Sequence, residues 1–196
     1  MTISTSMRKN IDSASFIRKM FEKGLELKKK YGEDNVFDLS IGNPIIEPPK
    51  EFRERLISII NSSEKGMHRY MSNAGYPETR KKIADHVSIQ EEIEFKLENI
   101  VMSCGAGGGL NVIFKTILNR GDEVIIIAPY FVEYFFYIAN HGGKVVIAEA
   151  NEDFTLNVEN IENKITGKTK AILINTPNNP TGKVYSEEDL KKLSQM

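Results

Sequence analysis

The sequence predicts an α/β fold in three layers (α/β/α), with a mostly parallel β-sheet between helices on its two faces. Strand-like and helix-like segments alternate from residue 99 to residue 194, which is the order that builds parallel β-α-β units. Three of the strand-like segments, VIIIA (124–128), KVVIA (144–148) and AILIN (171–175), are apolar throughout. Strands of a parallel sheet that helices cover on both faces have this composition.

Each element follows from the spacing of apolar residues or from a boundary signal. Before residue 90 the spacing predicts helices over 12–31, 50–60 and 76–87 and a short strand over 35–40. The remaining predicted elements are strands at 99–103, 122–128, 143–149 and 170–175 and helices at 108–119, 131–140, 157–165 and 186–194. The proline-rich run 44–50 predicts an extended crossing segment, which we take as the expected domain boundary.

Composition and charge exclude several classes of function. The chain has 26 basic and 27 acidic residues and a net charge of −1, so no basic surface for nucleic acid or anionic lipid is expected. A single cysteine excludes an internal disulfide framework. No apolar run approaches the roughly 18 residues of a membrane-spanning helix, and the amino terminus lacks the apolar core of a signal peptide. We therefore expect a cytoplasmic protein without nucleic-acid or membrane partners.

The run NTPNNPTG, residues 175–182, directly follows an apolar strand. Pro177 and Pro180 fix their own φ angles and restrict the residue before each of them to extended conformations. We therefore expect Asn179 to be presented at the carboxyl end of the strand, which is the edge where open α/β sheets bind ligands.

A glycine-rich turn, SCGAGGG (103–109), lies between a predicted strand and a predicted helix. Free N–H groups and the helix dipole at such a start favour an anion, so the turn predicts a phosphate site. The spacing does not fit a dinucleotide fingerprint, because the third glycine of GxGxxG would fall at Leu110, and no lysine follows to make a P-loop.

These motifs resemble those of the fold-type I aminotransferases of class I and II, pyridoxal phosphate enzymes of the aspartate aminotransferase type. The resemblance implies an incomplete large domain of that fold over residues 48–196, after an amino-terminal arm and small-domain segment over 1–47. It rests on five segments in the family's order: IGNP (41–44), YMSNAG (70–75) with Arg80, GAG (105–107), PYFVEY (129–134) and NTPNNPTG (175–182).

The resemblance implies three contacts to pyridoxal 5'-phosphate. Asn179 would hydrogen-bond the phenolic oxygen of the cofactor, and Phe131 would stack on its pyridine ring. Gly105, Ala106 and Gly107 would hold the phosphate. Gly107 departs from the family pattern, in which a residue with a hydroxyl or amide is common, so one side-chain contact to the phosphate is expected to be missing.

Further roles implied by the resemblance concern the substrate and a second subunit. Gly42 would lie near the substrate carboxylate, and Asn179 is assigned to the substrate as well. Tyr70 would reach the phosphate of a neighbouring subunit, which implies a homodimer. The segment departs from the family pattern at Thr79, where leucine is usual.

The implied activity is transfer of an amino group between an amino acid and a 2-oxo acid. No catalytic residue is assigned within the chain, because the lysine that forms the Schiff base is expected beyond Met196. Lys183 is expected to point away from the site. We therefore interpret the chain as the amino-terminal part of an aminotransferase.

Other functions remain open beside this interpretation. They are a pyridoxal phosphate-dependent carbon–sulfur lyase or synthase of the same fold, and a non-catalytic fragment that binds the cofactor or phosphate. A third class is a thiol hydrolase with Cys104 as nucleophile and His68 or His86 as base, but neither histidine lies in a recognisable partner motif.

Overall fold

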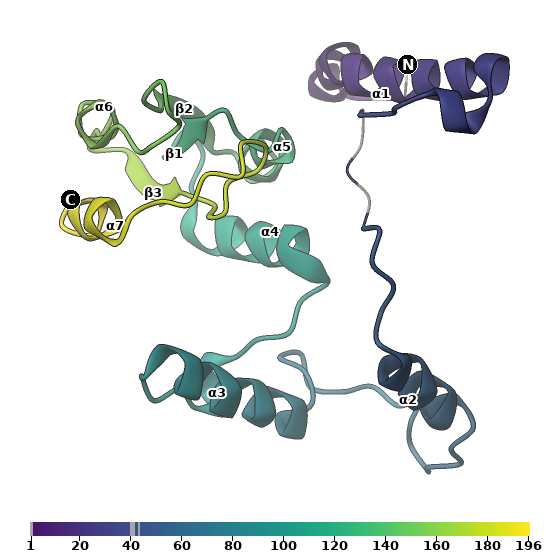
Figure 1. Cartoon of the computed structure of the whole chain (residues 1–196). Helices are drawn as coiled ribbons and strands as arrows, with labels where there is room; N and C mark the ends of the chain where they lie inside the picture. Colours follow the sequence, from purple (N-terminus) through teal and green to yellow (C-terminus); the bar gives the residue numbers. More distant parts are fainter. Residues whose placement is uncertain (1, 40–41, 43) are drawn as a thin grey trace. The chain divides into compact units, whose positions relative to one another are not determined.

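The computed structural model of the protein describes residues 2–39, 42 and 44–196 (Figure 1). The contacts within the chain divide it into two compact units, Met1–His68 and Arg69–Met196. The predicted alternation of helices and strands is found in the second unit, which also carries most of the candidate site residues.

The unit Met1–His68 contains helices α1 (Thr5–Tyr31) and α2 (Lys50–Ile60) and the short 3-10 helix η1 (Glu33–Asn35). The helix predicted over 12–31 starts earlier than expected, at Thr5. The Ser4 hydroxyl caps this start by accepting the Met7 N–H at 3.1 Å. The strand predicted over 35–40 is wrong for residues 36–39, which are irregular. The described part of this unit offers no strand with which they could pair. Ser40, Ile41 and Asn43 lie outside the described residues.

The unit Arg69–Met196 follows the predicted order of elements closely. Its helices are α3 (Pro77–Glu91), η2 (Leu97–Asn99), α4 (Gly105–Ile117), α5 (Glu133–Ala139), α6 (Val158–Glu162) and α7 (Glu187–Leu193). Its strands are β1 (Glu123–Ala128), β2 (Lys144–Glu149) and β3 (Thr169–Leu173).

The strand predicted over 99–103 is wrong, because this segment and the residues before it bond α3 and the loop preceding α3 instead of a neighbouring strand. Arg80 of α3 donates from Nε to the Ile100 carbonyl at 2.7 Å and from Nη2 to the Leu97 carbonyl at 2.6 Å. The Met102 N–H donates to the Ala74 carbonyl at 2.9 Å. The segment therefore packs against α3 as an irregular connection.

The three strands form a parallel sheet in the order β2-β1-β3, which confirms the predicted parallel arrangement. Ile125 at the centre of β1 is opposite Val146 of β2 and Ile172 of β3. Only β1 has the complete burial that the apolar composition predicts for all three strands. The prediction is wrong for β2 and β3 because they are the edges of the described sheet, where for example Ile147 is 41% exposed.

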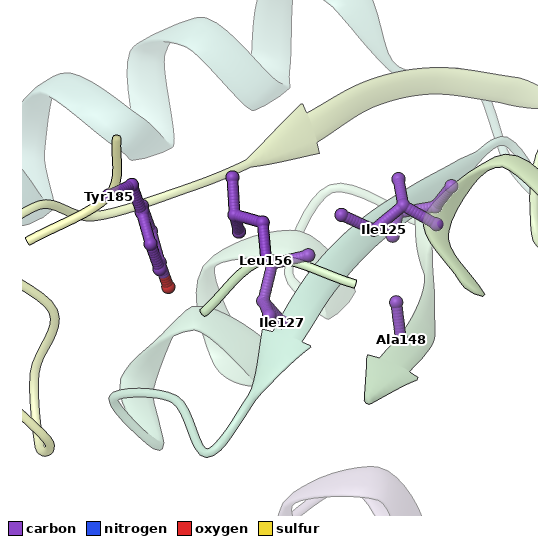
Figure 2. Packing of buried hydrophobic residues seen from close by; sticks show 6 residues of the cluster. Ile125, Ile127, Ala148, Leu156 and Tyr185 are labelled. Carbon is purple, nitrogen blue, oxygen red and sulfur yellow. The ribbon is translucent and has the colours of Figure 1, made fainter. Parts of the chain in front are cut away.

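Helices cover both faces of the sheet, so the predicted three-layer architecture is confirmed (Figure 1). On one face Val124 and Ile126 of β1 pack with residues of α4 and α5, among them Phe114 and Ile138. On the other face Ile125 and Ile127 pack with residues of α6, α7 and the connecting segments. Figure 2 shows Ile125, Ile127, Ala148, Leu156 and Tyr185 of this second cluster.

Candidate functional site

The turn after β3 is organised by Asn178, whose side chain is buried. Its Nδ2 donates to the Tyr185 hydroxyl at 3.3 Å, and its Oδ1 accepts the Thr181 hydroxyl at 3.0 Å and the Thr181 N–H at 3.3 Å. Two backbone bonds close the turn, from the Asn178 N–H to the Lys183 carbonyl at 2.8 Å and from the Gly182 N–H to the Asn178 carbonyl at 2.7 Å. The turn is therefore fixed by its own side chains and backbone.

Asn179 is exposed at the tip of this turn, as the sequence predicts. Its N–H donates to the Asn175 Oδ1 at 2.8 Å, while its side-chain amide bonds to none of the described residues. The amide group therefore has free donors and an acceptor for a ligand. Sequence reasoning missed Asn175 and Asn178, although asparagine side chains commonly bond the backbone of their own turn.

Phe131 lies in the connection between β1 and α5, and 37% of it is exposed. Its ring meets the ring of Tyr134 edge to face, with centroids 5.6 Å apart and an interplanar angle of 84°. The Tyr134 N–H also donates to the Phe131 carbonyl at 3.1 Å. The aromatic ring is thus held at the carboxyl end of β1 while part of it remains accessible.

The glycine-rich turn forms the first turn of α4, which begins at Gly105 and not at residue 108 as predicted. Gly105 has a φ of +67°, a conformation that glycine adopts without strain, and this lets the helix begin directly after Cys104. Its N–H donates to the Ser103 carbonyl at 3.1 Å. The N–H groups of Ala106 and Gly107 donate to no described residue, so two donors at the positive end of the helix dipole are free for an anion.

Gly107 lies against the side chain of Tyr137 on α5. A Cβ atom built on Gly107 would lie 2.8 Å from the Tyr137 hydroxyl oxygen and 3.2 Å from its Cζ. On the other side of the same turn, the Asn111 Nδ2 donates to the Gly107 carbonyl at 2.8 Å, and the Asn111 Oδ1 lies 3.0 Å from the His141 Nε2. This turn is therefore packed for a residue without a side chain at position 107.

Two tyrosines near the candidate segments, Tyr134 and Tyr185, have raised pKa values. Burial raises the pKa of Tyr134, and the nearby Tyr137 raises it further. Burial also raises the pKa of Tyr185, while the hydrogen bond from Asn178 lowers it and the nearby Tyr134 raises it. By geometry, Tyr137 packs beside the first turn of α4, and Tyr185 bonds Asn178 in the turn after β3. Since β1 and β3 are parallel neighbours, the segments that follow them leave the same edge of the sheet.

The other two predicted site residues are exposed. Gly42 belongs to the unit Met1–His68, and no atom lies within 4 Å of a Cβ built on it. Tyr70 belongs to the second unit and is fully exposed, with no described contact to its hydroxyl.

Lys183 and Cys104 form no second reactive site in the described residues. The Lys183 Nζ lies 3.0 Å from the Asp153 Oδ2, so its charge is directed to the connection after β2. Cys104 is exposed at the start of α4, and no hydrogen bond joins it to His86, the candidate base in the same unit. The described part of the chain also has no group of histidine, cysteine and acidic residues that could hold a metal ion. No helix within it is both long and apolar enough to traverse a bilayer.

The Asp153 carboxyl is expected to titrate well below the usual range. Hydrogen bonds from the Thr155 hydroxyl and N–H, followed by the bond from Lys183, lower its pKa from 3.8 to about 2. A lowered pKa stabilises the folded state above pH 3.8, and this contribution is lost as the pH falls toward 2. We expect carboxyl NMR resonances to report this midpoint, with Thr155→Val raising it more than Lys183→Met does. A wild-type midpoint near 3.8 would contradict the assignment.

Comparisons with known proteins give the relatives of this chain. The family model "Aminotransferase class I and II" matches residues 34–196. A probable aspartate/prephenate aminotransferase of Aquifex aeolicus is 39% identical over 175 residues, which are 88% of this chain and 43% of that protein. The aspartate aminotransferase of Bacillus subtilis is 37% identical over 176 residues, 89% of this chain and 44% of that protein. The chain thus spans less than half the length of these curated relatives.

Solved structures of similar proteins have the same fold over most of this chain. An amino transferase of Eubacterium rectale superposes with a TM-score of 0.93 at 35% identity, over 100% of this chain and 50% of that one. The aspartate aminotransferase of Thermotoga maritima gives a TM-score of 0.83 at 33% identity, over 91% of this chain and 47% of that one.

Proposed function

The chain belongs to the class I and II aminotransferases, and on this premise we propose that it supplies the cofactor-binding amino-terminal part of an amino-group transferase. The reaction would move an amino group between an amino acid and a 2-oxo acid. The observation that carries the proposal is that Phe131 and Asn179 follow two neighbouring parallel strands, β1 and β3, while the first turn of α4 packs against Tyr137 of α5. Relatives and similar structures are named as aspartate, aspartate/prephenate and alanine aminotransferases, so the proposal is confined to amino acids as a class.

The residues at this edge fit pyridoxal 5'-phosphate, on which the family generally depends. The free N–H groups of Ala106 and Gly107 suit an anionic phosphate at a helix start. The partly exposed ring of Phe131 suits stacking on a planar heterocycle, and the free amide of Asn179 suits a phenolic oxygen. When bound, the cofactor would supply the aldehyde that receives the amino group. These residues would bind and orient it.

Three further assignments belong to the same proposal. The exposed ring of Tyr70 is available to reach the phosphate of a second copy of the chain in a homodimer. Gly42 would lie near the substrate carboxylate. We also propose the division into an arm and small-domain segment at 1–47 and a large domain at 48–196, and a location in the cytoplasm.

Binding of the cofactor tests the proposal directly. Equilibrium dialysis of the chain with pyridoxal phosphate should show saturable binding at one site per chain, with inorganic phosphate as a competitor. Asn179→Ala should lower the affinity for pyridoxal phosphate and for pyridoxal about tenfold, because a hydrogen bond to the phenolic oxygen is lost, and should leave phosphate binding unchanged. Asn163→Ala, which removes an exposed amide at the end of α6, serves as the control. Absence of saturable binding by the wild-type chain would refute the proposed function.

A further inference from the structure

A tyrosine hydroxyl occupies the space beside the phosphate-binding turn that a side chain at residue 107 would need. The Tyr137 hydroxyl oxygen lies 2.8 Å from the position of a Cβ atom on Gly107. The hydroxyl of a serine at residue 107 would be attached to that same Cβ atom. The two hydroxyls are therefore alternatives for the same space beside the first turn of α4.

The structure holds this hydroxyl in place without giving it a partner. Tyr137 is partly buried, and it packs on the cluster formed by Phe114, Val124, Ile126 and Ile138. No described residue forms a hydrogen bond with the Tyr137 hydroxyl. The backbone N–H of Gly107, in the first turn of α4 beside it, also donates to no described residue. A fixed hydroxyl beside free donors at the start of a helix suits an anion that can accept several hydrogen bonds.

We propose that the Tyr137 hydroxyl donates a hydrogen bond to the cofactor phosphate and so replaces the side-chain hydroxyl that Gly107 lacks. The inference rests on the proposed cofactor site and adds a binding residue to it. A tyrosine carries a phenolic O–H, so the side chain acts as the donor and the phosphate oxygen as the acceptor. A glycine at residue 107 then leaves room for the hydroxyl that Tyr137 contributes from α5.

The contribution of the hydroxyl can be separated from that of the ring by comparing two ligands. Tyr137→Phe keeps the packing and removes only the oxygen. We expect it to lower the affinity for pyridoxal phosphate about tenfold, because a hydrogen bond to a charged group is lost, and to leave the affinity for pyridoxal unchanged. Tyr130→Phe is the matched control, since Tyr130 packs on the same cluster. Equilibrium dialysis measures both affinities, for pyridoxal phosphate and for pyridoxal, for the wild type and each variant.

A second test moves the hydroxyl from residue 137 to residue 107 and measures a recovery of cofactor binding. Tyr137→Leu removes both the hydroxyl and the obstruction at residue 107, and Gly107→Ser then returns a hydroxyl to the turn. The double variant should recover the preference for pyridoxal phosphate over pyridoxal that Tyr137→Leu alone loses. Gly107→Ser alone should bind pyridoxal phosphate more weakly than the wild type, because its Cβ meets the Tyr137 hydroxyl.

The outcomes distinguish a failure of the Tyr137 contact from a failure of the proposed function. Unchanged affinity of Tyr137→Phe for pyridoxal phosphate, or an equal loss for pyridoxal phosphate and pyridoxal, would overturn the role of Tyr137 while the proposed function stands. A wild-type chain that binds neither pyridoxal phosphate nor inorganic phosphate would overturn the proposed function and this inference together.

Discussion

Replacing Asn178 by alanine is expected to lower the free energy of unfolding of the unit Arg69–Met196 by about 2–3 kcal/mol. The side chain is only 8% exposed, and it bonds Tyr185 on one side and Thr181 on the other. Its loss leaves the Tyr185 hydroxyl without its donor inside the cluster shown in Figure 2. Buried polar groups without partners account for most of such a loss in stability.

The adjacent Asn179→Ala variant is the control for this prediction. It removes the same amide from an exposed position whose side chain has no described partner, so the free energy of unfolding should change by less than about 0.5 kcal/mol. Urea denaturation followed by far-ultraviolet circular dichroism measures both variants, since the chain contains no tryptophan. Equal denaturation midpoints for the two variants would contradict the structural role of Asn178.

The two asparagines also show how far a sequence motif can be interpreted. NTPNNPTG identified the turn, its place after a strand and the exposure of Asn179. The motif did not show that Asn178 builds the turn while Asn179 is presented by it. The partner of Asn178 is Tyr185, and Tyr185 reaches this position only when α7 packs on the sheet.

Contacts between distant segments account for the other differences. Segment 99–103 has strand-like composition, but Arg80 bonds the Ile100 carbonyl and the Met102 N–H bonds the Ala74 carbonyl, and the sequence shows no sign of either contact. Gly107 and Tyr137 are 30 positions apart and meet only because α4 and α5 pack on the same face of the sheet. The apolar composition predicted the same burial for β1, β2 and β3. Of these three strands, only the central β1 has a neighbouring strand on each side.

Removal of the Phe131 ring is expected to have the largest effect on the cofactor. Phe131→Ala should weaken the binding of pyridoxal phosphate roughly 10- to 100-fold, since stacking of a heterocycle on an aromatic side chain contributes about 1–3 kcal/mol. The loss should be the same for pyridoxal, because the stacked ring is common to both ligands, and inorganic phosphate should bind as before. Stability should change little, because the ring is 37% exposed and belongs to neither of the two buried clusters.

Phe135→Ala is the matched control for the ring. Phe135 is another exposed phenylalanine, on α5, and it meets Phe136 edge to face with centroids 5.7 Å apart. Phe131→Tyr should retain stacking, so its affinity should stay within about twofold of the wild type. If Phe135→Ala weakened pyridoxal phosphate as much as Phe131→Ala, the aromatic contribution would come from α5 in general and the stacking role of Phe131 would be wrong. A loss confined to Phe131→Ala, and equal for both ligands, would separate ring binding at Phe131 from phosphate binding at Tyr137.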